Sequence, residues 1–309
     1  MMINMDIITF KCLDCMELCL INIANYYRKS YALSFFKTFH FSFLNENQFL
    51  SAKLSIGEQQ INANVKTLYG ITLNDNSSNN INEIYQIELP CIVQTKINLC
   101  PWLPQYRLQS NLHFFIILGI DKDNLYIADP INSTKIITIL KSLSMNILHK
   151  IYYVECRYPY DMVSYKYIYE KSVQCINVNE LNESYTKFIE YLHTIKDLDI
   201  EYKNKDTHYH ISDIDKKIGY DIAGSRNLYA IFLDSINNYF LDERLETIKS
   251  NISKSMYMWT ELRNILFKSH ITKTFELKRS KIIRHIDKIR HLEIDLYNKL
   301  YDFYKEKYN

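Results

Sequence analysis

The feature that most constrains the fold is a change of character near residue 160 in a chain of 309 residues. Before this point, short apolar runs of strand length alternate with turn-forming residues. After it, the pattern becomes long, charged and helical. A chain of this length holds two domains or one large one. We therefore expect an α+β domain over residues 1–158 and an all-α domain over residues 159–309.

The first half predicts one buried helix followed by an antiparallel meander. Residues 14–27 have apolar side chains on most sides, and Asp14 is a suitable N-cap. Asn and Ser residues predict a polar loop over 72–83. The expected strands, separated by Pro, Gly or Asp, are 91–97, 113–120, 125–128 and 135–139.

The second half predicts helices from about residue 176, with a polar break over 196–216. In the final helix, roughly 276–306, apolar residues recur at heptad spacing, a pattern typical of helix pairing: Ile282, Ile286, Ile289, Leu296, Leu300 and Phe303. This seam favours a homodimer through the C-terminal helices. Glu293 replaces one apolar position of the seam. It either points to solvent or forms an ion pair in a substrate pocket or interface.

Charge and composition exclude several function classes. Residues 251–309 carry a net charge of +6 and the remainder −4, so the basic segment 278–290 is either a solvated helix face or a surface for an acidic partner. Near-neutral total charge argues against nucleic acid. Five glycines and no Gly-rich phosphate motif argue against a nucleotide site.

The seven cysteines predict reduced thiols in the cytoplasm. No signal peptide is recognised, and no apolar run reaches the length of a membrane span, so we expect no disulfide framework and no membrane partner. Cys19 is expected in the core. Cys12 and Cys15 form a C-x-x-C pair, a weak indication of a redox dithiol. The pair His208-x-His210 lies in a polar segment without paired cysteines, so we expect no metal site.

The strongest chemical pattern joins Cys15, His113 and Asp129. A cysteine in the first turn of a helix feels the positive end of the helix dipole, which favours the thiolate. A histidine at the start of a strand can act as general base. Asp129, 16 residues later on the next strand of a hairpin, can orient the imidazole. Each residue alone also suits an ordinary core or turn position.

The loop between two of the expected strands contains candidate substrate-binding residues. Trp102, between Pro101 and Pro104, and Tyr106 are placed there. The aromatic side chains can line a groove or simply pack the loop.

The first half resembles papain-like enzymes. The segment His113–Pro130 resembles the His/Asp half of the C39-type bacteriocin-leader peptidases. Residues 10–155 are more similar still to the N-terminal domain of the butirosin-biosynthesis acyltransferase H family. The matching pieces are Asp14-Cys15 with its helix, Pro90-Cys91-Ile92-Val93, Leu103-Pro104-Gln105-Tyr106, His113-Phe114 and Gly119-Ile120-Asp121. The helical half resembles the domain that often follows it.

Two positions depart from the peptidase pattern. Thr9 stands where papain-like peptidases place an oxyanion-hole Gln, and Met16 stands where a Gly often follows the nucleophile. Both departures argue against proteolysis. The backbone N–H of Cys15 is a candidate oxyanion donor.

The resemblance implies a papain-like fold and a cysteine-dependent acyltransferase that forms an amide in natural-product biosynthesis. Its donor would be an acyl thioester on the 4'-phosphopantetheine of a carrier protein, and its acceptor a small-molecule amine. The chain itself would need no cofactor. By analogy, thiotemplated products such as closthioamide are one setting. A cysteine peptidase or amidase with the same triad, and a non-catalytic helical scaffold, remain alternatives.

Overall fold

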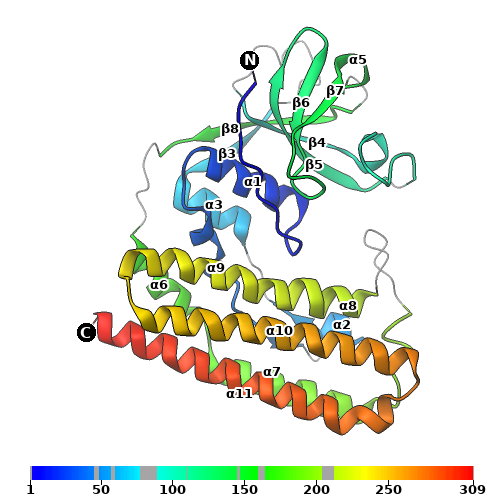
Figure 1. Ribbon diagram of the computed structural model, residues 1–309, viewed down its shortest axis with the longest axis vertical. Helices are drawn as coiled ribbons and strands as arrows, with labels where there is room; N and C mark the ends of the chain where they lie inside the picture. The colour runs from blue at the N-terminus through cyan, green and yellow to red at the C-terminus, as the bar shows by residue number, and fades with distance from the viewer. Residues whose placement is uncertain are drawn as a thin grey trace. The chain divides into compact units, whose positions relative to one another are not determined.

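The computed structural model describes residues 2–44, 49–56, 60–76, 89–108, 110–144, 147–158, 164–203 and 212–308. The chain forms two compact units. The first contains Met1–Tyr31 and Ile61–Val163, and the second contains Ala32–Gln60 and Ser164–Asn309. An antiparallel sheet organises the first unit and helices organise the second (Figure 1). The α+β class with a helical C-terminal region is therefore confirmed.

The sheet of the first unit has six strands in the order β3-β8-β4-β5-β6-β7, and all neighbours are antiparallel. The strands are β3 Ile71–Asn76, β4 Cys91–Lys96, β5 Leu112–Ile120, β6 Asn124–Ala128, β7 Ile137–Leu140 and β8 Lys150–Cys156. The helices are α1 Cys15–Tyr26, α3 Ile61–Tyr69 and the short α5 Lys141–Ser144, with a 3-10 turn at Ile97–Leu99. The meander from β4 to β7 is confirmed.

One prediction for this unit was wrong. The polar segment expected as a loop over 72–83 begins as strand β3, which pairs along its whole length with β8. The strand lies at the edge of the sheet. Polar residues are tolerated there because an edge strand has a neighbouring strand along one edge only, and its other edge is open to solvent. Residues 77–83 lie outside the described residues.

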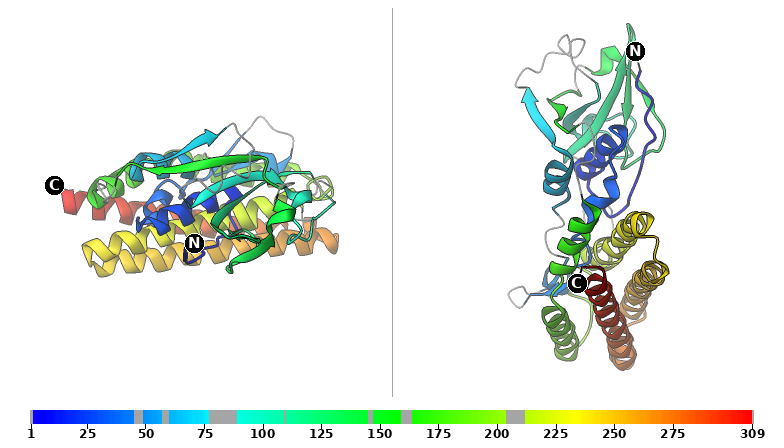
Figure 2. Two further views of the ribbon diagram at one scale, coloured as in Figure 1. Left: turned by 90° about the horizontal axis from the view of Figure 1, so that it is seen from above. Right: turned by 90° about the vertical axis from the view of Figure 1, so that its left-hand side faces the viewer.

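The second unit consists mainly of helices. They are α6 Tyr165–Gln174, α7 Val178–Thr194, α8 Asp213–Lys216, a π-helical segment Lys217–Ile222, α9 Ala223–Phe240, α10 Glu243–Ile271 and α11 Phe275–Tyr308. α10 packs against both α9 and α11, and Figure 2 shows these long helices almost end-on in its right panel. The predicted C-terminal helix is thus confirmed.

Residues 32–60 belong to this helical unit, whereas the sequence boundary at 158/159 assigned them to the first domain. The segment contains a 3-10 turn Tyr31–Phe35, the strand pair β1 Ser42–Phe43 and β2 Leu54–Ser55, and α2 Leu50–Lys53. The reason is aromatic packing. The ring of Phe41 lies 5.2 Å from that of Trp259, and the ring of Phe43 stacks 5.7 Å from that of Phe188.

The heptad seam of α11 is buried inside the chain. Its six apolar side chains are at most 2% exposed and pack against the other helices of the unit. The seam is therefore satisfied within one molecule, which leaves the predicted homodimer without the surface on which it rested.

Glu293 interrupts this seam and is fully buried. The Arg226 guanidinium donates to both of its oxygens at 2.8 Å. Ser255 and Trp259 donate to Oε1 at 2.5 and 3.0 Å, and Tyr185 donates to Oε2 at 2.7 Å. Burial alone would raise the pKa of Glu293, but the Arg226 charge and these hydrogen bonds lower it, so the carboxylate is ionised.

Arg226, the cation of this ion pair, has further partners besides Glu293. Arg226 Nη1 donates to the His40 carbonyl at 2.9 Å and to Ser225 Oγ at 3.0 Å. Its guanidinium lies 5.1 Å from the centre of the Phe39 ring. Residues 39 and 40 belong to the segment 32–60, whereas Arg226 lies in α9 and Glu293 in α11. The contacts of the ion pair therefore connect this segment to both helices.

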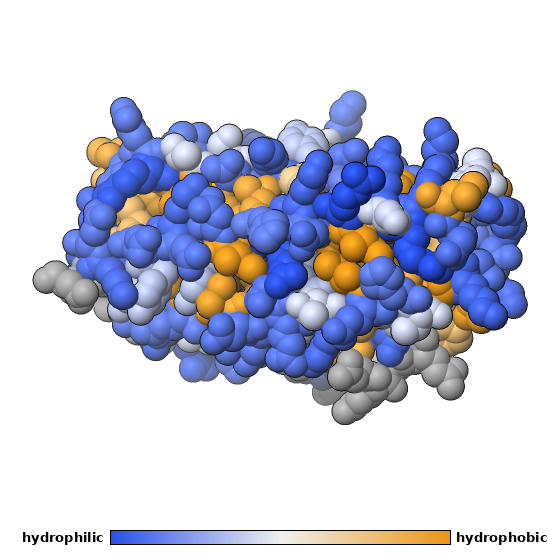
Figure 3. Space-filling view, turned by 90° about the horizontal axis from the view of Figure 1, so that it is seen from below, coloured by the Kyte–Doolittle hydropathy of each residue, from blue (hydrophilic) through white to orange (hydrophobic). Residues whose placement is uncertain are grey.

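The surface shown in Figure 3 is mostly hydrophilic, with separate apolar patches between polar side chains. Within the described residues, no helix combines the length and the apolar character needed to cross a membrane.

Removing one partner of the buried pair is expected to destabilise the helical unit strongly. Glu293→Gln leaves the Arg226 charge buried without its counter-charge, which costs about 3–5 kcal/mol. The free energy of unfolding measured in urea checks this. The matched control is Asp295→Asn on the same helix, which removes an exposed ion pair with Lys299 and should cost less than about 1 kcal/mol. Equal losses in the two variants would contradict the assignment.

Candidate active site

Cys15 is the first residue of α1 and is partly buried. Asp14 caps the helix: its carboxylate accepts from the Glu17 N–H at 2.8 Å, and the Glu17 carboxylate accepts from the Asp14 N–H at 3.0 Å. This capping box fixes where the helix begins. In the described hydrogen bonds of the first turn, the backbone N–H groups of Cys15 and Met16 are not used, so they are available as donors beside the thiol.

His113 and Asp129 meet because β5 and β6 form an antiparallel hairpin. The pairing of Ile116 with Ala128 brings the start of β5 next to the residue that follows β6. His113 Nε2 lies 3.0 Å from Asp129 Oδ2, and the two side chains are 2% and 0% exposed. The Cys15 side chain lies close enough to the imidazole to be one of the groups that raise its pKa. Since Nε2 is engaged by Asp129, Nδ1 is the nitrogen available to the thiol.

The surroundings of His113 favour its protonated form. Burial lowers the pKa of this imidazole, but the hydrogen bonds and charges of Asp129 and Cys15 outweigh burial and raise the pKa to about 9. An imidazolium therefore persists at neutral pH. A positive charge beside a cysteine stabilises its thiolate, which is the nucleophilic form.

Asp129 is held by more donors than the histidine alone. Trp102 Nε1 donates to Oδ2 at 2.7 Å, and Asn132 Nδ2 lies 3.2 Å from both oxygens. The turn after Pro130 brings Asn132 into place, because the N–H groups of Asn132 and Ser133 bond to the Asp129 carbonyl. These donors replace the hydration that the carboxylate loses on burial.

Asn22 anchors the segment that precedes Cys15. It is fully buried in α1. Its Oδ1 accepts from the Ile8 N–H at 2.8 Å, while its Nδ2 donates to the carbonyls of Ile8 and Leu18 at 2.8 and 2.9 Å. The extended segment before Cys15 is thereby fixed to the helix that carries the thiol. Thr9, the residue in the oxyanion-hole position of papain-like peptidases, follows directly and is exposed.

Thr95 places one further polar group beside the imidazole. It lies directly opposite His113 in the β4–β5 pair, so the two Cβ atoms are about 5 Å apart on the same face of the sheet. Thr95 is fully buried, and its hydroxyl has no hydrogen-bond partner within the described residues. The hydroxyl can therefore bond a polar group that enters next to His113.

The structure brings together four of the six predicted site residues: Cys15, His113, Asp129 and Trp102. The Trp102 indole binds Asp129 and packs edge-on against Phe115. Phe115, on β5, is the second ring of this contact. The Trp102 side chain thus supports the Asp129 carboxylate.

The other two residues do not join this cluster. Tyr106 lies in the loop after Trp102, where the Arg107 guanidinium stacks over its ring at 4.8 Å. Glu293 is in the core of the helical unit and its oxygens are occupied by protein donors, so the ion pair explains it without a substrate. The alternative that placed it at a solvent-facing flank was also wrong.

The remaining cysteine and histidine predictions have separate outcomes. Cys19 is fully buried, as expected, and burial raises its pKa. The pair His208 and His210 lies outside the described residues. Among the residues that are described, no group of three or more His, Cys, Asp or Glu could hold a metal ion.

Sequence reasoning missed Asn132 and Asn22 as members of the site. A signal existed for each. Asn132 follows Asp129-Pro130 at the spacing of a turn that returns its side chain to the aspartate. Asn22 is the one amide on the otherwise apolar, buried part of α1, where a polar group requires a specific partner.

No protein-family model matches this sequence, and no curated protein matches it either.

The raised pKa of His113 predicts a specific pH dependence of stability. The folded protein binds this proton more tightly than the unfolded chain, whose histidine has a pKa near 6.5. The resulting stabilisation, on the order of 3 kcal/mol, is fully present below pH 6.5 and lost as the pH rises through about 9.

Unfolding free energies measured from pH 6 to 10 test this expectation. His113→Gln serves as the reference because it lacks this titration but retains the other ionisable groups. The difference between the two proteins should shrink as the pH rises. A constant difference across that range would show that His113 does not bind its proton more tightly in the folded state.

Proposed function

We propose that this chain is a cysteine-dependent acyltransferase that forms an amide bond, with Cys15 as nucleophile, His113 as general acid and base, and Asp129 as the residue that orients His113. One observation carries the proposal: a thiol at the first turn of a helix interacts with an imidazole whose Nε2 is fixed at 3.0 Å by a fully buried carboxylate. This chain of contacts suits covalent catalysis by cysteine.

The first step transfers the acyl group to the enzyme. The Cys15 thiolate attacks the carbonyl carbon of an acyl thioester, and a tetrahedral oxyanion forms. The unused N–H groups of Cys15 and Met16 lie at the helix N-terminus, where donors stabilise developing negative charge. The oxyanion collapses, the C–S bond of the donor breaks, and the His113 imidazolium protonates the departing thiolate.

The second step releases the product. A neutral amine attacks the Cys15 thioester, and His113, now neutral, accepts the proton that the nitrogen loses. Collapse forms the amide and returns the Cys15 thiolate with a protonated His113. A thioester is converted to an amide, which is downhill, so no nucleotide is consumed.

The resemblance to the butirosin-biosynthesis acyltransferase H family supplies the substrate classes in this proposal. It suggests a papain-like fold, an acyl donor carried on the phosphopantetheine of a carrier protein, and a small amine acceptor. A cysteine peptidase or amidase is the second candidate, because the same three residues serve when water replaces the amine. The exposed Thr9 at the position of the usual oxyanion-hole Gln favours the acyltransferase.

Covalent capture of the acyl group tests the nucleophile. Incubation with a short-chain acyl-pantetheine thioester should add one acyl mass to the intact protein. Cys15→Ala should abolish the adduct, because its methyl side chain cannot form a thioester. Cys175→Ser, which replaces an exposed cysteine of the helical unit, should retain it. Amide formed on addition of an amine supports the transferase, and free acid alone supports the hydrolase. An adduct that persists in Cys15→Ala, or no adduct with any thioester or peptide, would overturn the proposal and favour a scaffold.

Trp102→Phe tests the support of the carboxylate. The substitution keeps an aromatic ring against Phe115 but removes the N–H donor to Asp129, a charge-assisted bond worth about 1.5–3 kcal/mol. We expect kcat to fall about tenfold or more with little change in KM. With one donor fewer, Asp129 holds the imidazolium more tightly, so the alkaline limb of the pH profile should move to higher pH.

The matched control for this variant is Phe115→Leu, which disturbs the same ring contact and keeps the donor. It should leave the position of the alkaline limb unchanged. A purely structural role for Trp102 would lower activity in both variants without moving that limb.

A further inference from the structure

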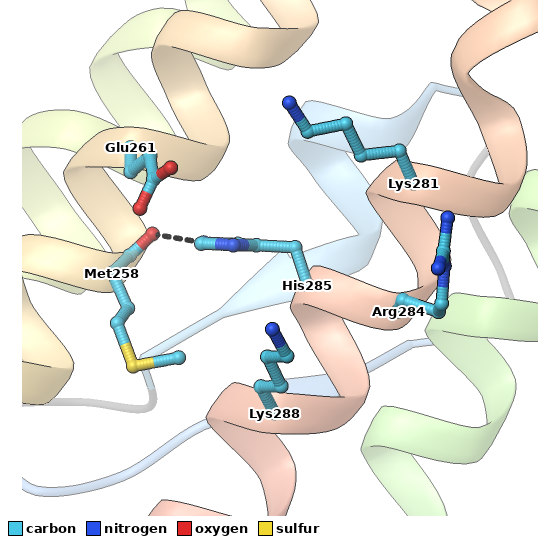
Figure 4. Close-up of a pocket in the computed structure, with 6 residues that line it drawn as sticks. All are labelled: Met258, Glu261, Lys281, Arg284, His285 and Lys288. Atoms are coloured by element: carbon cyan, nitrogen blue, oxygen red, sulfur yellow. Dashed lines mark hydrogen bonds between the residues drawn. The ribbon is translucent and has the colours of Figure 1, made fainter.

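A groove between α10 and α11 has features that the proposed chemistry does not use. It encloses about 490 Å³ and is lined by Met258 and Glu261 from α10 and by Lys281, Arg284, His285 and Lys288 from α11. In Figure 4 the His285 side chain projects from α11 toward α10, and its Nε2 lies 2.8 Å from the Met258 carbonyl oxygen. We propose that this groove binds the phosphate group of a small phosphorylated molecule.

The cations of the groove are unbalanced within their own helix. Lys281, Arg284 and Lys288 follow one another at spacings of three and four residues, so they share one face of α11. Like charges at these spacings destabilise a helix. Within the part of the chain that the structure describes, none of the three forms an ion pair, and Arg284 donates only to the Ser280 carbonyl of its own helix. A bound anion would remove this repulsion.

A second cavity between the same two helices shows the opposite arrangement. It encloses about 310 Å³ and is lined in part by Arg244, Lys299 and Glu306. Its cations are matched by carboxylates: Arg244 pairs with Asp242 and Glu306, and Lys299 pairs with Asp295. The cations Arg244 and Lys299 of this cavity thus have carboxylate partners, whereas the three cations of the groove have none among the residues that the structure describes.

Size and charge indicate the class of ligand. A volume of about 490 Å³ lies in the range of small-molecule pockets. Three cations and one carboxylate give the lining a net charge of +2, which matches a phosphate dianion, and Lys and Arg both bind phosphate through charge-assisted hydrogen bonds.

Glu261 decides between a small molecule and an acidic protein surface. Its carboxylate faces the cations from α10 and would repel a run of acidic side chains laid along the groove. The same carboxylate can accept a hydrogen bond from a hydroxyl group. A ligand with a phosphate toward α11 and hydroxyls toward α10, such as a sugar phosphate, satisfies both walls.

Calorimetric titration with ribose 5-phosphate at low salt tests the inference on the full chain. The double variant Lys281→Gln/Lys288→Gln should weaken binding by at least about tenfold, since each lost charge-assisted contact is worth more than 1.4 kcal/mol. The control Lys299→Gln/Lys305→Gln removes the same charge from α11 outside the groove and should change affinity less than about twofold. Glu261→Gln should reduce the preference for ribose 5-phosphate over inorganic phosphate.

Three results would overturn the inference: no binding of ribose 5-phosphate or inorganic phosphate at millimolar concentration, equal weakening in the two double variants, or binding of a polyglutamate peptide without binding of either phosphate. The last result would assign the groove to an acidic protein partner instead. None of these outcomes depends on the Cys15 chemistry.

Discussion

A carboxylate that leaves water must receive enough hydrogen bonds to replace its hydration, and this requirement shapes both units of the chain. Asp129 in the sheet unit is bonded by His113, Trp102 and Asn132. Glu293 in the helical unit is bonded by Arg226 and three neutral donors. Apart from Asn132, which follows Asp129 in the same turn, these donors come from other segments of the chain, so the carboxylate fixes how those segments meet.

The two carboxylates nevertheless have different consequences. Arg226 is a permanent cation, so its pair with Glu293 does not exchange protons and leaves no group to react. His113 can lose and regain a proton, and its other nitrogen is available to Cys15. Burial of Asp129 therefore produces a tunable base, while burial of Glu293 produces a fixed structural ion pair. The difference depends on the cation and not on the carboxylate.

Local patterns predicted much of the fold. The N-cap of α1 at Asp14, the hairpin that joins His113 to Asp129 and the apolar seam of α11 each depend on neighbouring residues, and each was predicted. The partners of Glu293 lie 34–108 residues away in sequence, and β3 pairs with a strand more than 70 residues later. A single sequence does not display contacts over such separations. The bond from Trp102 to Asp129 was not predicted, because an aromatic residue in a loop gives no sign of where its N–H points.

The excursion of residues 32–60 affects the order in which the protein can fold during synthesis. The chain leaves the sheet unit after residue 31 and returns at residue 61, while the helices that bury Phe41 and Phe43 follow only from residue 164. At about 5–20 residues per second, several seconds or longer pass between the synthesis of these aromatic residues and the synthesis of the helices that bury them. The sheet unit is completed first, while residues 32–60 still lack the helices that bury their aromatic side chains. α10 and α11 then supply Trp259 and Glu293, so the core that buries Phe41 and Phe43 is completed only after the sheet unit.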